Sequence, residues 1–323
     1  MNDIAREQRA AVSRLSLEAG GGAVSGVEHP VHEAVMVDEV LGFLASGGGG
    51  LVVDCTVGLG GHARALIDAG ASRVIGLDRD PSAIAAASAR LAPCADRVEL
   101  VHRDYREIEA VLDERGISRV DGVLADLGVS SMQLDAAGRG FSFRRDEPLD
   151  MRMDTSTGET AAEALGAVDE ATLADVIFRF GEERYARRVA RAIVHVRARE
   201  AIETTGQLAA IVRHVIPVRG YSRIDPATRT FQALRIWVNG ELDGLDRFLA
   251  AASRRLSVGA RLVVIAFHSL EDRVVKHTLR ALQAEEDSNV RVVTKRPTTP
   301  TAAEVARNPR ARSAKLRVAE RPA

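Results

Sequence analysis

The sequence predicts an α/β protein in which an open parallel sheet carries an inserted all-helical domain. Three observations lead to this fold class. Short apolar runs alternate with helix-like patterns up to residue 126. The first run ends in an aspartate, a glycine turn and a helix, which is how a nucleotide-binding α/β unit begins. Strand-like runs then disappear for about 100 residues before they return.

Seven apolar runs are expected to form the strands. The first four are separated by helical patterns, and a β-α-β-α-β-α-β order predicts parallel pairing with right-handed crossovers. The fifth run is apolar throughout, as in a strand that is buried on both faces. The expected strands are 51–54, 73–78, 98–102, 122–126, 261–267, 290–294 and 315–318.

The helices follow from a periodicity of 3.6 residues. Pro81 stands at a tolerated first-turn position, and Ser269 is expected to cap a helix with two acidic residues in its first turn. Residues 230–256 form one long amphipathic pattern that ends at Gly259. The expected helices are 29–44, 61–69, 81–91, 106–114, 171–180, 183–196, 205–215, 230–256 and 270–282.

Interruptions in the alternation of strand-like and helix-like patterns predict the domain limits. Residues 1–28 mix charged residues with a Gly-rich end and lack an apolar signal segment, so we expect a flexible N-terminal tail. Residues 29–134 and 236–323 are expected to form the core. Residues 135–235 are expected to form the inserted helical domain.

Composition narrows the class of protein. Hydrophobic residues make up 46% of the 323 residues, which is enough for a sizeable core. No run of apolar residues is as long as the about 18 residues that a membrane-spanning helix needs. Two cysteines exclude a disulfide framework and a four-cysteine zinc site, so we expect a cytoplasmic protein. Cys55 is expected to be buried filler, because Asp54 beside it disfavours a thiolate.

The net charge of −1 conceals an uneven distribution. Residues 179–235 carry 12 Arg against 5 acidic residues, and residues 291–321 carry 9 Lys or Arg against 2 Glu. Two basic segments on a nearly neutral chain fit a polyanionic partner. A solvated helix face and an ordinary basic tail explain them equally well from charge alone.

The carboxyl ends of the expected strands are polar and acidic, and ligands of parallel sheets bind there. No Lys follows the glycine turn, although a triphosphate-binding loop needs one. The glycines alone also fit NAD. S-adenosylmethionine fits better, because it has ribose hydroxyls, no phosphate and a cationic sulfur suited to acidic strand ends. The strand-end residues are Asp54, Asp78, Asp104, Tyr105, Asp126 and His268.

Each of these residues also has a purely structural interpretation. Asp78 could cap the next helix, and His268 could cap the turn after its strand. Tyr105 could be an edge residue of the core, and His62 could lie on the surface of its helix. Asp126, followed by Leu-Gly, is the strongest functional candidate.

Longer motifs give a specific resemblance. They include Asp-Cys-Thr-Val-Gly-Leu-Gly-Gly-His at 54–62, Asp-Leu-Gly-Val-Ser-Ser at 126–131, Leu-Asp-Met-Arg-Met-Asp at 149–154, Phe-His-Ser-Leu-Glu-Asp-Arg at 267–273 and Asn-Pro-Arg-Ala-Arg-Ser at 308–313. On these motifs the chain resembles the RsmH/MraW family of bacterial 16S rRNA (cytosine-N4)-methyltransferases. The resemblance covers residues 29–321.

The resemblance implies a class I, Rossmann-like methyltransferase core that uses S-adenosylmethionine and has a helical domain inserted after the fourth strand. It implies 16S rRNA in the small ribosomal subunit as the substrate. No metal and no membrane are expected, and the protein is expected to be a monomer or a homodimer. The implied cofactor contacts are Gly60, Gly61, His62, Asp78, Tyr105, Asp126 and Gln133.

We interpret Asp126 as the catalytic residue of a direct, in-line transfer. An acceptor at this position would orient the amine and favour the positive charge that develops on its nitrogen. Phe141 and Phe143 could stack on an unstacked base, or could equally form a hydrophobic plug between core and insertion. The other candidate substrate contacts are Arg184, Arg188, Arg229 and His268, with Arg223, Arg307, Arg310 and Arg312 extending the basic surface.

Two other functions stay open from the residues alone. An NAD-dependent oxidoreductase could use a similar sheet, although no hydride-transfer acid is paired with a substrate arginine. A non-catalytic nucleic-acid-binding protein could keep the fold, although the full set of polar strand ends argues against the loss of a functional site.

Overall fold

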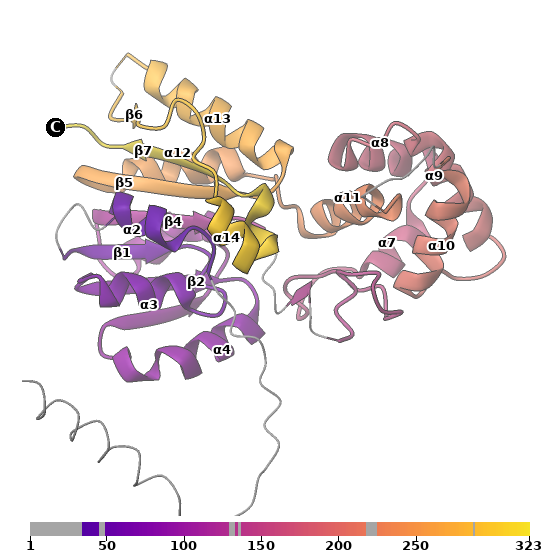
Figure 1. Ribbon diagram of the computed structural model, residues 1–323, viewed down its shortest axis with the longest axis horizontal. Helices are drawn as coiled ribbons and strands as arrows, with labels where there is room; N and C mark the ends of the chain where they lie inside the picture. The colour runs from indigo at the N-terminus through magenta and orange to yellow at the C-terminus, as the bar shows by residue number, and fades with distance from the viewer. Residues whose placement is uncertain (1–33, 45–48, 129–132, 135–136, 218–224, 287) are drawn as a thin grey trace, which may run out of the picture. The chain divides into compact units, whose positions relative to one another are not determined.

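The computed structural model describes residues 34–44, 49–128, 133–134, 137–217, 225–286 and 288–323. Seven strands form a sheet in the order β3-β2-β1-β4-β5-β7-β6 (Figure 1). Strands β1 to β5 pair in parallel, and β7 is antiparallel to both of its neighbours. The predicted α/β class is confirmed. The strands are β1 Leu51–Asp54, β2 Arg73–Asp78, β3 Val98–His102, β4 Val120–Asp126, β5 Leu256–Ala266, β6 Arg291–Val292 and β7 Lys315–Glu320.

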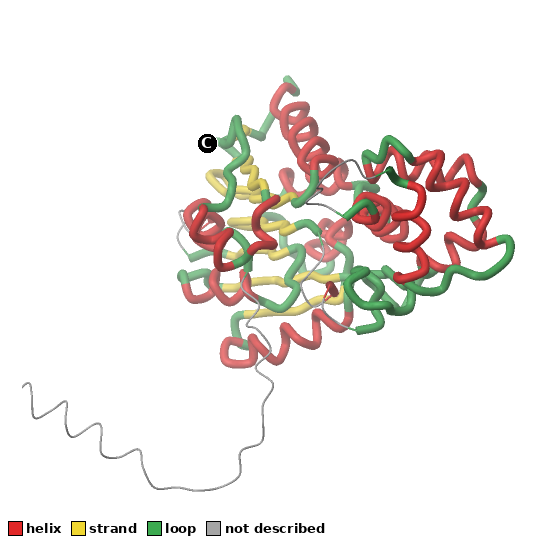
Figure 2. Tube along the Cα trace, turned by 45° about the vertical axis from the view of Figure 1, so that its right-hand side comes forward, coloured by secondary structure: helices red, strands yellow, loops and turns green. Residues whose placement is uncertain are grey.

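Helices cover both faces of the sheet (Figure 2). Side chains alternate along a strand, so neighbouring residues of β1 enter different cores. Val52 packs with α2, α3 and α4, whereas Val53 packs with α5, α12 and α13. These helices are α2 Val37–Leu44, α3 Gly61–Asp68, α4 Pro81–Leu91, α5 Ile108–Asp113, α12 Leu245–Arg254 and α13 Ser269–Ala284; α14 Ala302–Arg307 follows β6.

The helices described between β4 and α12 lie where the sequence predicts a helical insertion. They share a buried cluster of their own, which includes Leu165, Ile177, Ile193, Leu208 and Phe231. The predicted limits of this domain, 135 and 235, stay a prediction. The helices are α7 Ala161–Ala167, α8 Glu170–Gly181, α9 Ala186–Arg197, α10 Thr205–Val215 and α11 Ala227–Asn239.

The single helix predicted over 230–256 is wrong. Helix α11 ends at Asn239, and α12 begins only at Leu245. Gly240 ends α11 in a left-handed conformation with φ of 55°, and Gly244, with φ of 70°, is the residue from which α12 starts. Gly259, expected to end that helix, lies inside β5, which begins earlier than predicted.

Several sequence predictions fall outside the described residues. These are the tail at 1–28, residues 29–33 of the helix predicted over 29–44, residues 129–131 of the motif after β4, and Arg223. The helix predicted over 29–44 is present as α2, preceded by a turn at residues 34–36. None of the described helices combines the length and apolar character that a bilayer crossing requires.

Gly181 allows α8 and α11 to pack closely. A β-carbon at this position would lie 2.5 Å from the backbone oxygen of Arg229. Because the obstacle is backbone, the helices would have to separate. We expect Gly181→Ala to lower the free energy of unfolding by about 1–3 kcal/mol, measured by urea denaturation.

Gly166 in α7 provides the matched control, since nothing lies within 4 Å of its added β-carbon. Gly166→Ala should raise the free energy of unfolding by about 0.5–1 kcal/mol, because glycine is a poor helix former. Equal stability of the two variants would show that the contact between α8 and α11 is not tight.

Candidate functional site

The turn after β1 lets the backbone approach a ligand. Gly58 and Gly60 have φ of 50° and 77°, and Gly60 is the residue from which α3 starts. A β-carbon on Gly61 would lie 2.9 Å from the β-carbon of Ala34, so residue 34 packs directly on the turn. The predicted glycine loop therefore has the compact geometry that favours close backbone contact with a bound molecule.

Asp78, at the end of β2, braces this turn. Its Oδ2 accepts the N–H of Gly58 at 2.9 Å, and its Oδ1 accepts the N–H of Asp80 at 2.9 Å. Asp80 caps α4 by accepting the N–H of Ser82, so the alternative in which Asp78 is the cap is wrong. Burial raises the pKa of Asp78 to about 6, against the lowering effect of both N–H donors.

Asp54 and Asp126 are carboxyl groups at the ends of the paired strands β1 and β4. Thr56 links them: its N–H donates to Asp54 Oδ1 at 3.2 Å, and its Oγ1 accepts the N–H of Asp126 at 2.7 Å. Asp54 Oδ2 and Asp126 Oδ1 are buried and have no hydrogen-bond partner among the described residues. Two carboxyl oxygens are thus available at one edge of the sheet.

Burial is the main reason why both groups hold a proton more tightly than usual. It raises the pKa of Asp54 to about 7, with a further contribution from the charge of Asp78. It raises the pKa of Asp126 well above the usual range, with further contributions from Asp54 and Glu271. A cation at this edge would favour the ionised carboxylates, whereas a phosphate would be repelled by them.

His62 is buried, so the alternative in which it lies on the helix surface is wrong. Its Nε2 lies 2.9 Å from the carbonyl oxygen of Val35. Since a carbonyl only accepts, Nε2 carries the proton. Its Nδ1 lies 3.7 Å from Asp126 Oδ2. The imidazole therefore connects the turn at residues 34–36 to the carboxyl group of Asp126.

Two further predicted cofactor contacts, Tyr105 and Gln133, are already engaged in contacts with the protein. Tyr105 packs edge-on against Phe248, with ring centroids 4.7 Å apart, and its hydroxyl donates to the Glu241 carbonyl at 3.3 Å. Gln133 Nε2 donates to Asp80 Oδ2 at 2.9 Å. Their roles toward a cofactor stay predictions.

Cys55 is buried beside Asp54, and burial raises the pKa of its thiol. This fits the interpretation of Cys55 as inert filler.

His268, rather than the predicted Ser269, caps α13. Its Nδ1 accepts the N–H of Glu271 at 3.3 Å, and Glu271 Oε2 accepts the N–H of His268 at 3.3 Å. The Ser269 hydroxyl instead donates to Glu182 Oε2 at 2.7 Å. The sequence interpretation included His268 but missed the buried glutamates around it, although Glu271 has the third-position spacing of a capping box.

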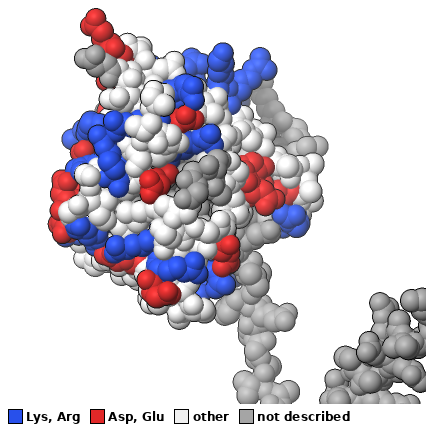
Figure 3. All heavy atoms as spheres, turned by 90° about the vertical axis from the view of Figure 1, so that its left-hand side faces the viewer, with Lys and Arg blue, Asp and Glu red and all other residues white. Residues whose placement is uncertain are grey.

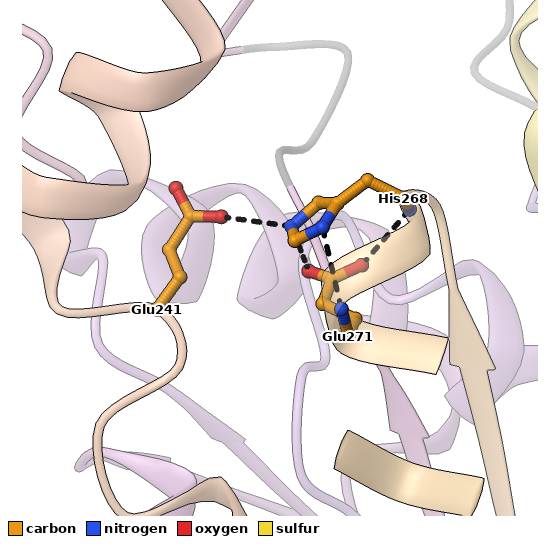
Figure 4. A group of neighbouring side chains, drawn as sticks. All are labelled: Glu241, His268 and Glu271. Carbon is orange, nitrogen blue, oxygen red and sulfur yellow. Dashed lines mark hydrogen bonds and ion pairs between the residues drawn. The ribbon is translucent and has the colours of Figure 1, made fainter. Parts of the chain in front are cut away.

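Figure 4 shows His268 between Glu241 and Glu271. His268 Nε2 lies 3.1 Å from Glu271 Oε1 and 3.9 Å from Glu241 Oε2. Burial opposes a charge on the ring, whereas the two carboxylates favour a proton on Nε2. Arg235 also binds Glu241, through both carboxylate oxygens at 2.7 and 2.8 Å.

Within the described residues, this cluster has the composition of a metal site, with ligand atoms within 4.8 Å of one another. A metal on Nε2 would require the ring proton on Nδ1. Nδ1 accepts a backbone N–H, so the geometry favours a proton on Nε2 over a metal ion. Arg235 already balances one of the two carboxylates.

The aromatic candidates pack inside the protein. Phe141 is buried, and the Arg139 guanidinium lies 5.8 Å from its ring centroid. Phe143 packs edge-on against Phe231 of α11, with centroids 4.7 Å apart. This contact favours the hydrophobic interpretation of Phe143, and base stacking by either ring stays a prediction.

The basic candidates lie on or next to α9. Its apolar side, with Val189 and Ile193, is buried, whereas Arg184 and Arg188 are exposed. Arg229 of α11 is exposed and lies 3.8 Å from Glu183. Figure 3 shows a different face, the one on the left in Figure 1, where basic and acidic side chains are interspersed.

The chain is similar to known proteins over most of its length. The model of the MraW methylase family matches residues 29–322. A protein named Ribosomal RNA small subunit methyltransferase H from Nitratidesulfovibrio vulgaris (strain DP4) is 50% identical over 311 residues, covering 91% of this chain and 96% of the relative. A protein of the same name from Sorangium cellulosum (strain So ce56) is 52% identical over 291 residues, covering 90% of each chain.

Among solved structures, an rRNA methylase from Streptococcus thermophilus covers 92% of this chain and 99% of its own, with a TM-score of 0.40 and 12% identity. That likeness is too distant to carry an argument. The family match and the relatives decide against an NAD-dependent oxidoreductase and against a non-catalytic binding protein. The chain belongs to the MraW methylase family and is an S-adenosylmethionine-dependent methyltransferase.

Proposed function

We propose that the protein methylates the exocyclic N4 of a cytosine in the 16S rRNA of the small ribosomal subunit. The observation that carries this proposal is the likeness, over about nine-tenths of the chain, to proteins named Ribosomal RNA small subunit methyltransferase H. The N4 position follows from the family resemblance of the motifs. Asp126 supports it, because a buried acceptor suits an amino group.

The carboxyl groups at the ends of β1, β2 and β4 suit S-adenosylmethionine. When bound, this cofactor supplies an electrophilic methyl group on a positively charged sulfur. The glycine turn, His62, Asp78 and Asp126 are the residues that would hold it. Asp54 and Asp126, whose buried oxygens have no partner among the described residues, favour a cation beside them.

Asp126 would act on the amine. Cytosine N4 is a poor nucleophile, because its lone pair is delocalised into the ring. Asp126 Oδ1 would accept one N–H, orient the lone pair and favour positive charge on the nitrogen. The nitrogen would then attack the methyl group that the cofactor supplies, and the Asp126 carboxylate would take one N–H proton from it.

The target base must leave its stack to reach Asp126. The exposed arginines on and next to α9 would hold the RNA backbone through phosphate contacts, which position the strand without reading its sequence. Arg307, Arg310 and Arg312, which are exposed beyond β6, would extend this surface.

The proposal is tested by incubating the protein with methyl-labelled S-adenosylmethionine and small subunits that lack the modification. The labelled nucleotide is then mapped by mass spectrometry. Label on N4 of a cytosine in 16S rRNA is expected. Label on another base or on another atom of cytosine would overturn the proposal.

Cofactor binding should release protons. Asp78 and Asp54 have pKa values of about 6 and about 7, and a bound cation lowers the pKa of nearby carboxyl groups. At a pH between these values, titration calorimetry in buffers of different ionisation enthalpy should detect a net release of up to about one proton. S-adenosylhomocysteine, whose sulfur is neutral, is the control and should release fewer. Equal release by both ligands would contradict the role of the sulfonium charge.

Asp126→Asn should lower kcat by about 10²–10³-fold at saturating cofactor, because the amide accepts a hydrogen bond but takes no proton. The wild-type rate should fall with decreasing pH well above pH 4, since burial raises the pKa of Asp126 and protonation removes the acceptor. The variant should lack this pH dependence. Asp113→Asn, at an exposed carboxylate on α5, is the control. A wild-type rate in Asp126→Asn would exclude the proposed role.

The double variant Arg184→Gln with Arg188→Gln should bind small subunits more weakly. Its plot of log affinity against log salt should be shallower by about 0.7–0.9 for each phosphate that is no longer neutralised by an arginine. Binding of S-adenosylmethionine should not change. Arg73→Gln with Arg254→Gln removes the same charge from exposed positions elsewhere and should keep the wild-type slope. An equally shallow slope in both double variants would mean that only net charge matters.

A further inference from the structure

Glu304 makes a contact that its local sequence does not lead one to expect. Thr301-Ala-Ala-Glu304 has the spacing of a capping box, in which the glutamate returns to the start of its own helix. Half of the box forms, because Thr301 Oγ1 accepts the N–H of Glu304 at 3.1 Å. The carboxylate leaves the helix instead, and its Oε1 accepts the N–H of Met36 at 2.6 Å across 268 residues of sequence. Glu304 is only 8% exposed.

Met36 has a backbone conformation that needs outside support. Its φ is 55°, a left-handed value that a long side chain rarely adopts, and its side chain is 1% exposed. Such a conformation persists only where the surroundings fix it. The Glu304 carboxylate fixes the N–H, and the core between the sheet and α2 holds the side chain.

The turn held in this way touches the active site at two points. Ala34 packs on Gly61, where an added β-carbon would lie 2.9 Å away. The carbonyl of Val35 holds His62 Nε2 at 2.9 Å, and His62 Nδ1 lies 3.7 Å from Asp126 Oδ2. A continuous set of contacts therefore runs from Glu304 through residues 34–36 and His62 to Asp126.

We propose that Glu304 is a positioning residue for methyl transfer, which fixes residues 34–36 so that the Val35 carbonyl sets the ring of His62 against Asp126. It touches neither cofactor nor base. The inference rests on the proposed role of Asp126. Removal of the carboxylate would leave a buried N–H without its acceptor, release the left-handed turn and free the imidazole to rotate.

The experiment compares Glu304→Ala, Glu304→Gln and Glu304→Asp with the wild type. The readouts are the ring ¹⁵N shifts of His62 by NMR, the affinity for S-adenosylmethionine, the single-turnover rate on small subunits, and Tm. Glu304→Ala should lower the rate by about ten- to a hundredfold at saturating cofactor and move the His62 ring shifts. Glu304→Gln should stay near wild type, because its amide oxygen also accepts the Met36 N–H. Glu304→Asp, shorter by one methylene, should lie between them.

Thr301→Ala is the matched control. It removes the cap of α14 but leaves the Glu304 carboxylate in place, so it should lower Tm without changing the rate or the His62 shifts. A drop in rate in Thr301→Ala equal to that in Glu304→Ala would reduce Glu304 to a structural role and overturn the inference. A wild-type rate and unmoved His62 shifts in Glu304→Ala would also overturn it.

If Glu304→Ala does not fold, the relative activities of Glu304→Gln and Glu304→Asp decide the role of Glu304. A positioning acceptor predicts that Glu304→Gln is more active than Glu304→Asp, and the reverse order overturns the inference. The NMR shifts need no RNA, so a wild type that fails to label cytosine would defeat the proposed function while the His62 shifts still decide the role of Glu304.

Discussion

The burial of carboxyl groups at the ends of β1 and β4 is the constraint on which the rest of the site depends. Removing a carboxylate from water without a partner is costly, and proteins usually respond by pairing it or by keeping it protonated. Asp54 and Asp126 each leave one oxygen without a partner among the described residues. The ends of these two strands are therefore suited to a ligand that carries positive charge. This condition separates a sulfonium from the phosphates of a dinucleotide more sharply than the glycine turn does.

A second group of buried charges is built on the opposite principle. A chain of polar contacts links Arg235, Glu241, His268 and Glu271, and backbone N–H groups satisfy part of Glu271. These contacts hold α11 and the loop after it against the start of α13. The fold thus contains two sets of acidic residues. In one set, Arg235 and backbone N–H groups bind the carboxylates. In the other, Asp54 and Asp126 each keep one oxygen without a partner among the described residues.

The elements that local signals specify were predictable from the sequence. Helix α10 has the predicted limits, because Thr204 and Gln207 form a capping box at its start. The strand ends, and with them Asp54, Asp78 and Asp126, follow from apolar runs that stop abruptly. Contacts between distant residues were not predictable. The partner of Ser269 is Glu182, 87 residues away, and nothing near Gly240 in the sequence distinguishes a break between two helices from a tolerated glycine inside one.

Strand β7 lies between β5 and β6, although it follows both in the chain. During synthesis on the ribosome, the sheet can therefore grow only as far as β5 until the segment Lys315–Glu320 has emerged. Until then the edge of β5, with Val263, Val264 and Ile265, lacks the neighbour that buries it in the finished sheet. An unpaired apolar edge is a template for association with other chains. The nascent protein is thus most exposed to aggregation in the interval between the emergence of β5 and that of β7.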